Sequence, residues 1–163
     1  METNALFYRI QEGVVTVDDY ILWSQTLLKN DVSSTSLSVI SSLPSNNNMF
    51  EVEDYFKRAL KELDIEIPKI EKSSRAYISL LATQILIKED DTERFHLAHE
   101  IFRIVSDLHY PDDLMEWYYI NEMIDQIKYD KSSIKFNEED ITLKIKEEAK
   151  LLLDSLNSKS LKK

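Results

Sequence analysis

The chain has 163 residues, among them no cysteine, one glycine and three prolines. Because cysteine is absent, neither a disulfide framework nor a thiolate metal site can form, which excludes the disulfide-rich extracellular class. One glycine cannot supply the glycine-rich loops that cradle phosphate groups. A multi-stranded sheet also consumes many turn residues. These absences favour helices joined by polar loops.

Long apolar segments are absent as well. No run approaches the roughly 20 residues that a helix needs to span a bilayer. The first residues, Met1 to Asn4, lack the basic region with which a secretory signal peptide begins. We therefore expect a cytoplasmic protein without membrane contact.

The charge is acidic and unevenly spread, with a formal net charge of −10. Residues 1–60 carry eight acidic and four basic side chains, residues 61–130 carry sixteen and eight, and residues 131–163 carry six and eight. The net charges of the three segments are therefore −4, −8 and +2. Nucleic-acid binding relies on cationic side chains that displace counterions from phosphates, so direct nucleic-acid binding is not expected. Moderate acidity also serves solubility alone.

Most of the chain shows helical periodicity. Thr16 stands three residues before Asp19, which is a capping-box spacing, and apolar residues then repeat at intervals of three and four. Such patterns predict helices over residues 4–12, 17–29, 37–43, 48–63, 70–88 and 92–109, and two more that begin near residues 111 and 137. The sequence thus predicts an all-α fold of six to eight helices in one compact, antiparallel, bundle-like domain over residues 1–157. A basic, frayed tail, residues 158–163, should follow.

The segment over residues 70–88 is apolar around more than half of its helical circumference. One stripe contains Tyr77, Ile78, Leu81 and Ile85. A helix that is apolar on most sides is typically buried. We therefore expect this helix at the centre of the fold.

Residues 107–130 combine seven carboxylates, one lysine and five large aromatic side chains. Acidic groups steer a basic partner, while Trp and Tyr supply the rigid anchors that dominate interfaces. Five rings cannot all point to one side of a helix, so some should meet solvent. Pro111 should hold Tyr110 extended. At helical spacing Trp117 and Tyr118 also suit a hydrophobic core, and this alternative stays open.

The sequence shows no convincing metal site. Glu93 and His96 have the Glu-x-x-His spacing of helical di-iron sites, but such sites need a second copy of the motif, and there is none. His96 and His99 could form a two-histidine metal pair. A histidine pair on a polar helix edge explains them without a metal. We therefore predict no metal and no cofactor.

Catalytic signatures are missing too. There is no Gly-x-Ser-x-Gly elbow for a nucleophile. Acidic pairs stand at residues 90–91, 112–113 and 138–139. Each pair lies where a helix should begin, so capping and the helix dipole account for it without acid–base catalysis. We therefore predict that the protein is not an enzyme.

Three short stretches resemble a known family. They are Leu80-Leu81 with Gln84-Ile85-Leu86, His99-Glu100-Ile101, and Leu108-His109-Tyr110-Pro111-Asp112-Asp113-Leu114 before an aromatic helix. Over about residues 70 to 125 the chain resembles the small all-helical immunity proteins of bacterial polymorphic-toxin systems. The resemblance implies stoichiometric binding and neutralisation of a cognate toxin, with no cofactor.

These observations together predict a protein-binding module, in the first place an immunity protein that neutralises a basic toxin through an acidic aromatic face. The predicted partner-binding residues are Tyr110, Asp112, Asp113, Glu116, Trp117 and Tyr119. The alternative is a small helical regulatory or scaffolding protein that binds a partner helix or peptide in a groove lined by Met and Leu. In both cases the partner is a protein, and the sequence does not indicate whether the chain forms homo-oligomers.

Overall fold

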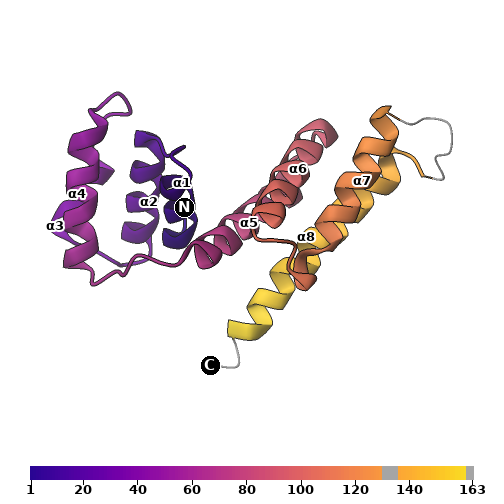
Figure 1. Ribbon diagram of the computed structural model, residues 1–163. Coiled ribbons are helices and arrows are strands. Elements are labelled where there is room, and N and C mark those ends of the chain that lie inside the picture. Colours follow the sequence, from indigo (N-terminus) through magenta and orange to yellow (C-terminus); the bar gives the residue numbers. More distant parts are fainter. Residues whose placement is uncertain (130–135, 161–163) are drawn as a thin grey trace. The chain divides into compact units, whose positions relative to one another are not determined.

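The computed structural model describes residues 1–129 and 136–160, without the side chains of 157–160. Within these ranges all regular secondary structure is helical, with eight α-helices, one short 3-10 helix and no strand (Figure 1). The helices are α1 (Thr3–Gln11), α2 (Val17–Lys29), α3 (Thr35–Ser41), α4 (Met49–Glu62), α5 (Ile70–Ile87), α6 (Asp91–Asp107), η1 (Asp112–Leu114), α7 (Glu116–Tyr129) and α8 (Glu138–Ser160). The prediction of an all-α fold with six to eight helices is confirmed.

The helices gather in two compact units, Met1–Tyr77 and Ile78–Lys163. Helix α5 is continuous across this division and matches the helix predicted over residues 70–88. Its residues Leu81 and Ile85 are buried, as the apolar stripe indicated. The predictions of one domain over residues 1–157 and of a central α5 stay predictions.

In the first unit, side chains cap the N-termini of helices α2, α3 and α4. The Thr16 hydroxyl accepts a hydrogen bond from the Asp19 N–H, and the Asp19 carboxylate accepts one from the Thr16 N–H at 2.8 Å. This confirms the predicted capping box at the start of α2. Single side-chain caps begin the next two helices. The Ser34 side chain accepts a hydrogen bond from a backbone N–H of α3, and the Asn48 side chain accepts one from a backbone N–H of α4. Local sequence therefore fixes where these helices start.

Aromatic side chains fill the core of the first unit. Phe56 of α4 lies at its centre, with ring centroids at 5.0 Å from Tyr20, 5.0 Å from Trp23 and 5.7 Å from Phe7. These tilted and edge-on arrangements are the favourable ones for aromatic pairs. The buried Trp23 indole N–H donates a hydrogen bond to the Thr3 hydroxyl at 3.0 Å. Burial of this ring therefore leaves no polar atom of the indole without a partner.

In the second unit α6, α7 and α8 pack pairwise against one another, and α7 lies beside α8 (Figure 1). The buried hydrophobic residues of this unit are Ile78, Leu81, Ala82, Ile85, Ala98, Ile101, Ile104, Val105, Leu114, Trp117, Ile120, Ile124, Ile141, Ile145 and Ala149. Asn137 and Asp140 cap α8 reciprocally, since each backbone N–H donates to the other side chain at 2.9 Å. The predicted start of the last helix is thus confirmed.

A buried arginine organises the turn from α5 into α6. The Arg94 guanidinium donates hydrogen bonds to the carbonyls of Ile85 at 3.3 Å, Glu89 at 3.1 Å and Lys88, and it pairs with Asp91. The last carbonyls of a helix have no partner within the helix. Arg94 therefore closes the end of α5 with a cation, which also suits the negative end of the helix dipole.

Helix α8 continues to Ser160, so residues 158–160 of the predicted frayed tail are helical. The rest of that tail, 161–163, lies outside the described residues. No helix within the described ranges combines the length and the apolar character needed to cross a bilayer.

Candidate protein-binding surface

The turn after α6 has an unusual backbone. His109 has φ of +62° and Tyr110 has φ of +55°, which places both in the left-handed region. The prediction that Pro111 holds Tyr110 extended is therefore wrong. The Tyr110 N–H donates to the Val105 carbonyl at 2.9 Å, a bond that closes the end of α6. A bulky residue in this region costs on the order of 1–3 kcal/mol, which surrounding contacts must offset.

Side-chain contacts of Tyr110 supply part of that compensation. Its hydroxyl lies 3.0 Å from the hydroxyl of Ser106, which is in the last turn of α6. Its ring meets the Tyr118 ring edge-on, with centroids 5.9 Å apart and planes at 90°. Tyr110 nevertheless stays 41% exposed. The turn thus holds one aromatic ring in a defined position at the surface.

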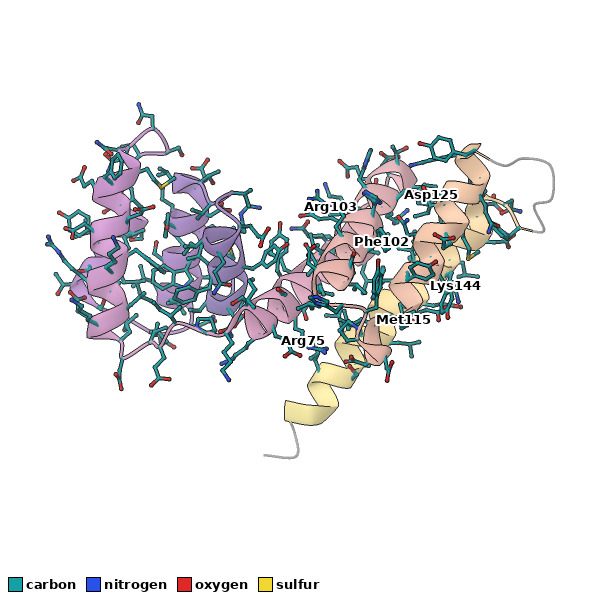
Figure 2. All side chains as sticks on the ribbon, in the orientation of Figure 1. Arg75, Phe102, Arg103, Met115, Asp125 and Lys144 are labelled. Atoms are coloured by element: carbon teal, nitrogen blue, oxygen red, sulfur yellow. The ribbon has the colours of Figure 1, made fainter. Side chains whose placement is uncertain are left out.

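Further rings continue from Tyr118 along α6 and α7. The Tyr118 centroid lies 5.5 Å from that of Tyr119 and 6.2 Å from that of Phe102, and the Phe102 centroid lies 5.9 Å from the His99 ring. We call His99, Phe102, Tyr110, Tyr118 and Tyr119 the aromatic ladder; Phe102 is labelled in Figure 2. Tyr119 is 52% exposed. The ladder is therefore a branched cluster of rings around Tyr118 that is partly open to solvent.

A polar chain lies beside the ladder. Asn121 donates an amide hydrogen to the Asp125 carboxylate at 3.1 Å, and its amide oxygen lies 2.8 Å from His99 Nδ1. Because an ionised carboxylate only accepts, the Asn121 amide nitrogen must face Asp125 and its oxygen must face His99. His99 Nδ1 then carries the proton and donates it to Asn121. In the neutral imidazole, Nε2 is left as a hydrogen-bond acceptor.

The predicted carboxylates differ in their surroundings. Asp112 and Asp113 are exposed at the first turn of η1, directly after the strained turn. Glu116 is only partly exposed and forms an ion pair with Lys144 of α8; Lys144 is labelled in Figure 2. Burial raises the pKa of the neighbouring Glu148 carboxyl, and the charge of Glu116 raises it further, while Lys144 lowers it. Glu116 is thus engaged with α8 rather than offered freely to a partner.

Trp117 does not belong to this surface. Its side chain is 0% exposed, and its indole N–H has no hydrogen-bond partner among the described residues. Trp117, Ile120 and Ile124 follow at helical spacing on the buried face of α7. The prediction of Trp117 as a partner contact is therefore wrong, and the alternative that it is core is correct. Tyr119, two residues further, lies on the opposite side of the helix.

Sequence reasoning missed five members of the site: His99, Phe102, Tyr118, Asn121 and Asp125. Their common signal is a helical interval, three residues between His99 and Phe102 on α6 and four between Asn121 and Asp125 on α7. The pairing of the two helices, however, joins residues 22 positions apart in the chain, as in the contact of His99 with Asn121. Intervals within one helix do not reveal such a pairing.

Two shallow hollows lie elsewhere. One of about 230 Å³ in the second unit is lined by Gln84, Lys88, Glu93, His96, Leu97 and Glu100. One of about 330 Å³ in the first unit is lined by Lys57, Leu60, Lys61, Asp64, Ile65 and Ile67. Glu93, near His96, pairs with Lys88 at 2.8 Å. Across the described part of the chain, no group of three or more His, Asp or Glu side chains is arranged to hold a metal.

Comparison with known proteins gives no further guide, since no protein-family model, no curated protein and no solved structure matches this chain. The resemblance to immunity proteins therefore stays a prediction.

Proposed function

We propose that this chain is a non-catalytic protein-binding module, namely an immunity protein that binds and neutralises a cognate basic toxin. The observation that carries the proposal is the aromatic ladder, a cluster of partly exposed rings beside exposed carboxylates. Exposed rings held in fixed positions are suited to anchor a partner at low entropic cost. Carboxylates around them are suited to steer a basic partner to that place.

The proposed contact residues are a revision of the predicted set. Tyr110, Tyr119, Asp112 and Asp113 are retained, and the half-buried Tyr118 joins them through its ring contacts with Tyr110 and Tyr119. Trp117 is left out of the proposed contact residues because it is buried in the core.

The proposal is tested first with the neighbouring genes. An adjacent reading frame that ends in a basic toxic domain is expected, and producing that domain alone should arrest growth. Co-production of the wild-type chain should restore growth, whereas Tyr119→Ala should restore it poorly. Phe50→Ala is a matched control, because Phe50 is an exposed aromatic of the first unit. If the wild-type chain gives no protection, the proposal is wrong.

Binding kinetics should separate the roles of charge and rings. The combined replacement of Asp112 and Asp113 by Asn should slow association chiefly at low salt, because exposed charges are screened at higher salt. Tyr119→Ala should instead shorten the lifetime of the complex, since truncation of a central aromatic commonly costs about 2 kcal/mol or more. Wild-type kinetics in both folded variants would contradict the proposed surface.

A second candidate is a regulatory or scaffolding protein that binds a peptide. The hollow of the first unit favours it, because Leu60, Ile65 and Ile67 line it between two lysines. An apolar peptide with acidic ends would suit this lining. Under this alternative Ile67→Asp, and not Tyr119→Ala, should abolish binding of the natural partner.

A further inference from the structure

We infer that the aromatic ladder binds arginine side chains, so that the partner presents an arginine-rich rather than a lysine-rich segment. The inference rests on the proposed function and narrows the chemistry of the partner. Its basis is the combination of ring faces and hydrogen-bond acceptors at one surface.

The first argument concerns the rings. The planes of Tyr110 and Tyr118 meet at 90°, and those of Tyr118 and Tyr119 at 76°. In such edge-on pairs the edge of one ring contacts the face of the other, and Tyr110 and Tyr119 stay 41% and 52% exposed, so both rings are accessible to a partner. An uncovered aromatic face attracts cations. A flat guanidinium can stack on such a face, whereas an ammonium group approaches it only as a point charge.

The second argument concerns the acceptors. In its neutral form, with Nδ1 donating to Asn121, His99 offers Nε2 as an acceptor, and Asn121 in turn donates to Asp125. The tyrosine hydroxyl oxygens of the ladder are further acceptors. A guanidinium carries five N–H donors in a rigid fork, which can serve several fixed acceptors at once. A lysine side chain carries its three N–H donors on a single flexible ammonium group, so it matches several fixed acceptors less well.

Charge favours a cationic partner of either kind. Glu122 and Asp125 on α7 and Asp112 on η1 add negative charge around the rings. Arg103, exposed next to Phe102 on α6, is a cation that opposes an incoming guanidinium (Figure 2). Removal of this charge should strengthen binding of cationic peptides of both kinds without changing the preference between them.

The test titrates the full chain with hexa-arginine and with hexalysine at low ionic strength, followed by the NMR signals of backbone amides and aromatic rings. Hexa-arginine should bind about threefold tighter or more. Its largest shifts should fall on His99, Tyr118 and Tyr119. In Tyr119→Ala the preference for hexa-arginine should disappear, while hexalysine should bind as before. The control Phe50→Ala should keep the wild-type preference.

Two results would overturn the inference: equal affinity of the two peptides for the wild-type chain, or an arginine preference that survives Tyr119→Ala. Both leave the proposed function standing, because a toxin can be held by other contacts of the same surface. The proposed function fails by a different measurement, the absence of protection by the wild-type chain against the neighbouring basic toxin.

Discussion

The largest clusters of aromatic rings in the two units lie in different surroundings. In the first unit Phe56 is buried among Phe7, Tyr20 and Trp23, where the rings form the core. In the second unit Tyr110 and other rings of the ladder form a cluster that is partly open to solvent. Aromatic content alone therefore does not locate a binding surface. The helix that covers a ring, or leaves it uncovered, decides its role.

The residues with a left-handed backbone conformation also differ between the two units. In the first unit they are Gly13, Asp31 and Asp64, residue types that accept this conformation at little cost. In the second unit they are the consecutive His109 and Tyr110. Tyrosine is poorly suited to this region, so backbone strain is concentrated beside the aromatic ladder. Strain of this kind is often retained at functional sites.

The largest effect expected from this comparison is on the core ring. Phe56→Ala should reduce the free energy of unfolding by about 3–5 kcal/mol, because it removes a buried ring that contacts three others. Tyr119→Ala should change it by less than about 1 kcal/mol, because Tyr119 is exposed. Denaturant unfolding of the full chain measures both. Equal losses of unfolding free energy in the two variants would show that Tyr119 is packed in a core as Phe56 is.

The next effect concerns the buried cation of the second unit. Arg94→Met should cost about 2–4 kcal/mol, since it leaves the carbonyls at the end of α5 and the Asp91 charge without their partner. Arg103→Met is the control, because an exposed change of this kind stays within about 0.5 kcal/mol. Hydrogen exchange should reveal the loss as faster exchange in the last turn of α5. An unaltered rate there would contradict the capping role of Arg94.

A smaller effect of opposite sign is expected at the strained turn. His109→Gly should raise the free energy of unfolding by about 0.5–1 kcal/mol, because glycine accepts the left-handed backbone without strain. Asp107→Gly, at the last residue of α6, is the control and should change it by less than about 0.5 kcal/mol, because Asp and Gly are both weak helix formers. Thermal unfolding measures both changes. A destabilised His109→Gly would mean that the turn stores no strain at this residue.

The smallest effects concern two carboxylates whose responses to pH should be opposite. Hydrogen bonds from Ser36, and also from Ser34, lower the pKa of Glu62 in the first unit. A lowered pKa stabilises the fold above the ordinary glutamate pKa, and this contribution is lost as pH falls through the lowered value. Glu62→Gln should therefore destabilise the protein at neutral pH, and the difference from wild type should shrink in acid.

In the second unit burial, followed by the charge of Glu116, raises the pKa of Glu148. A raised pKa stabilises the fold below the ordinary value, and this contribution is lost as pH rises through the raised value. Glu148→Gln should therefore stabilise the protein at neutral pH, by less than about 1 kcal/mol because the group is partly exposed, and should match wild type in acid. Melting temperatures measured between neutral and acidic pH test both. If both variants shift the melting temperature at neutral pH in the same direction relative to wild type, the two predictions are contradicted.

The sequence by itself determined the helical fold and where several helices begin. The capping box of Thr16 with Asp19 and the helix start near residue 137 were predicted, and both are formed, whereas the helix predicted from near residue 111 begins only at Glu116, after η1. Such caps join residues three positions apart, so they need no information from the rest of the chain. The acidic aromatic segment was also visible, because composition requires no tertiary structure.

Only the tertiary structure decided which side chains of that segment meet solvent. Trp117 and Tyr119 are two residues apart and of similar character, yet α7 buries one and exposes the other. The pairing of α6 with α7 likewise set His99 against Asn121 and built the ladder. Helical spacing fixes the angle between two residues on one helix, about 100° per residue. It does not say which neighbouring helix covers each angle, because that depends on residues far away in the chain.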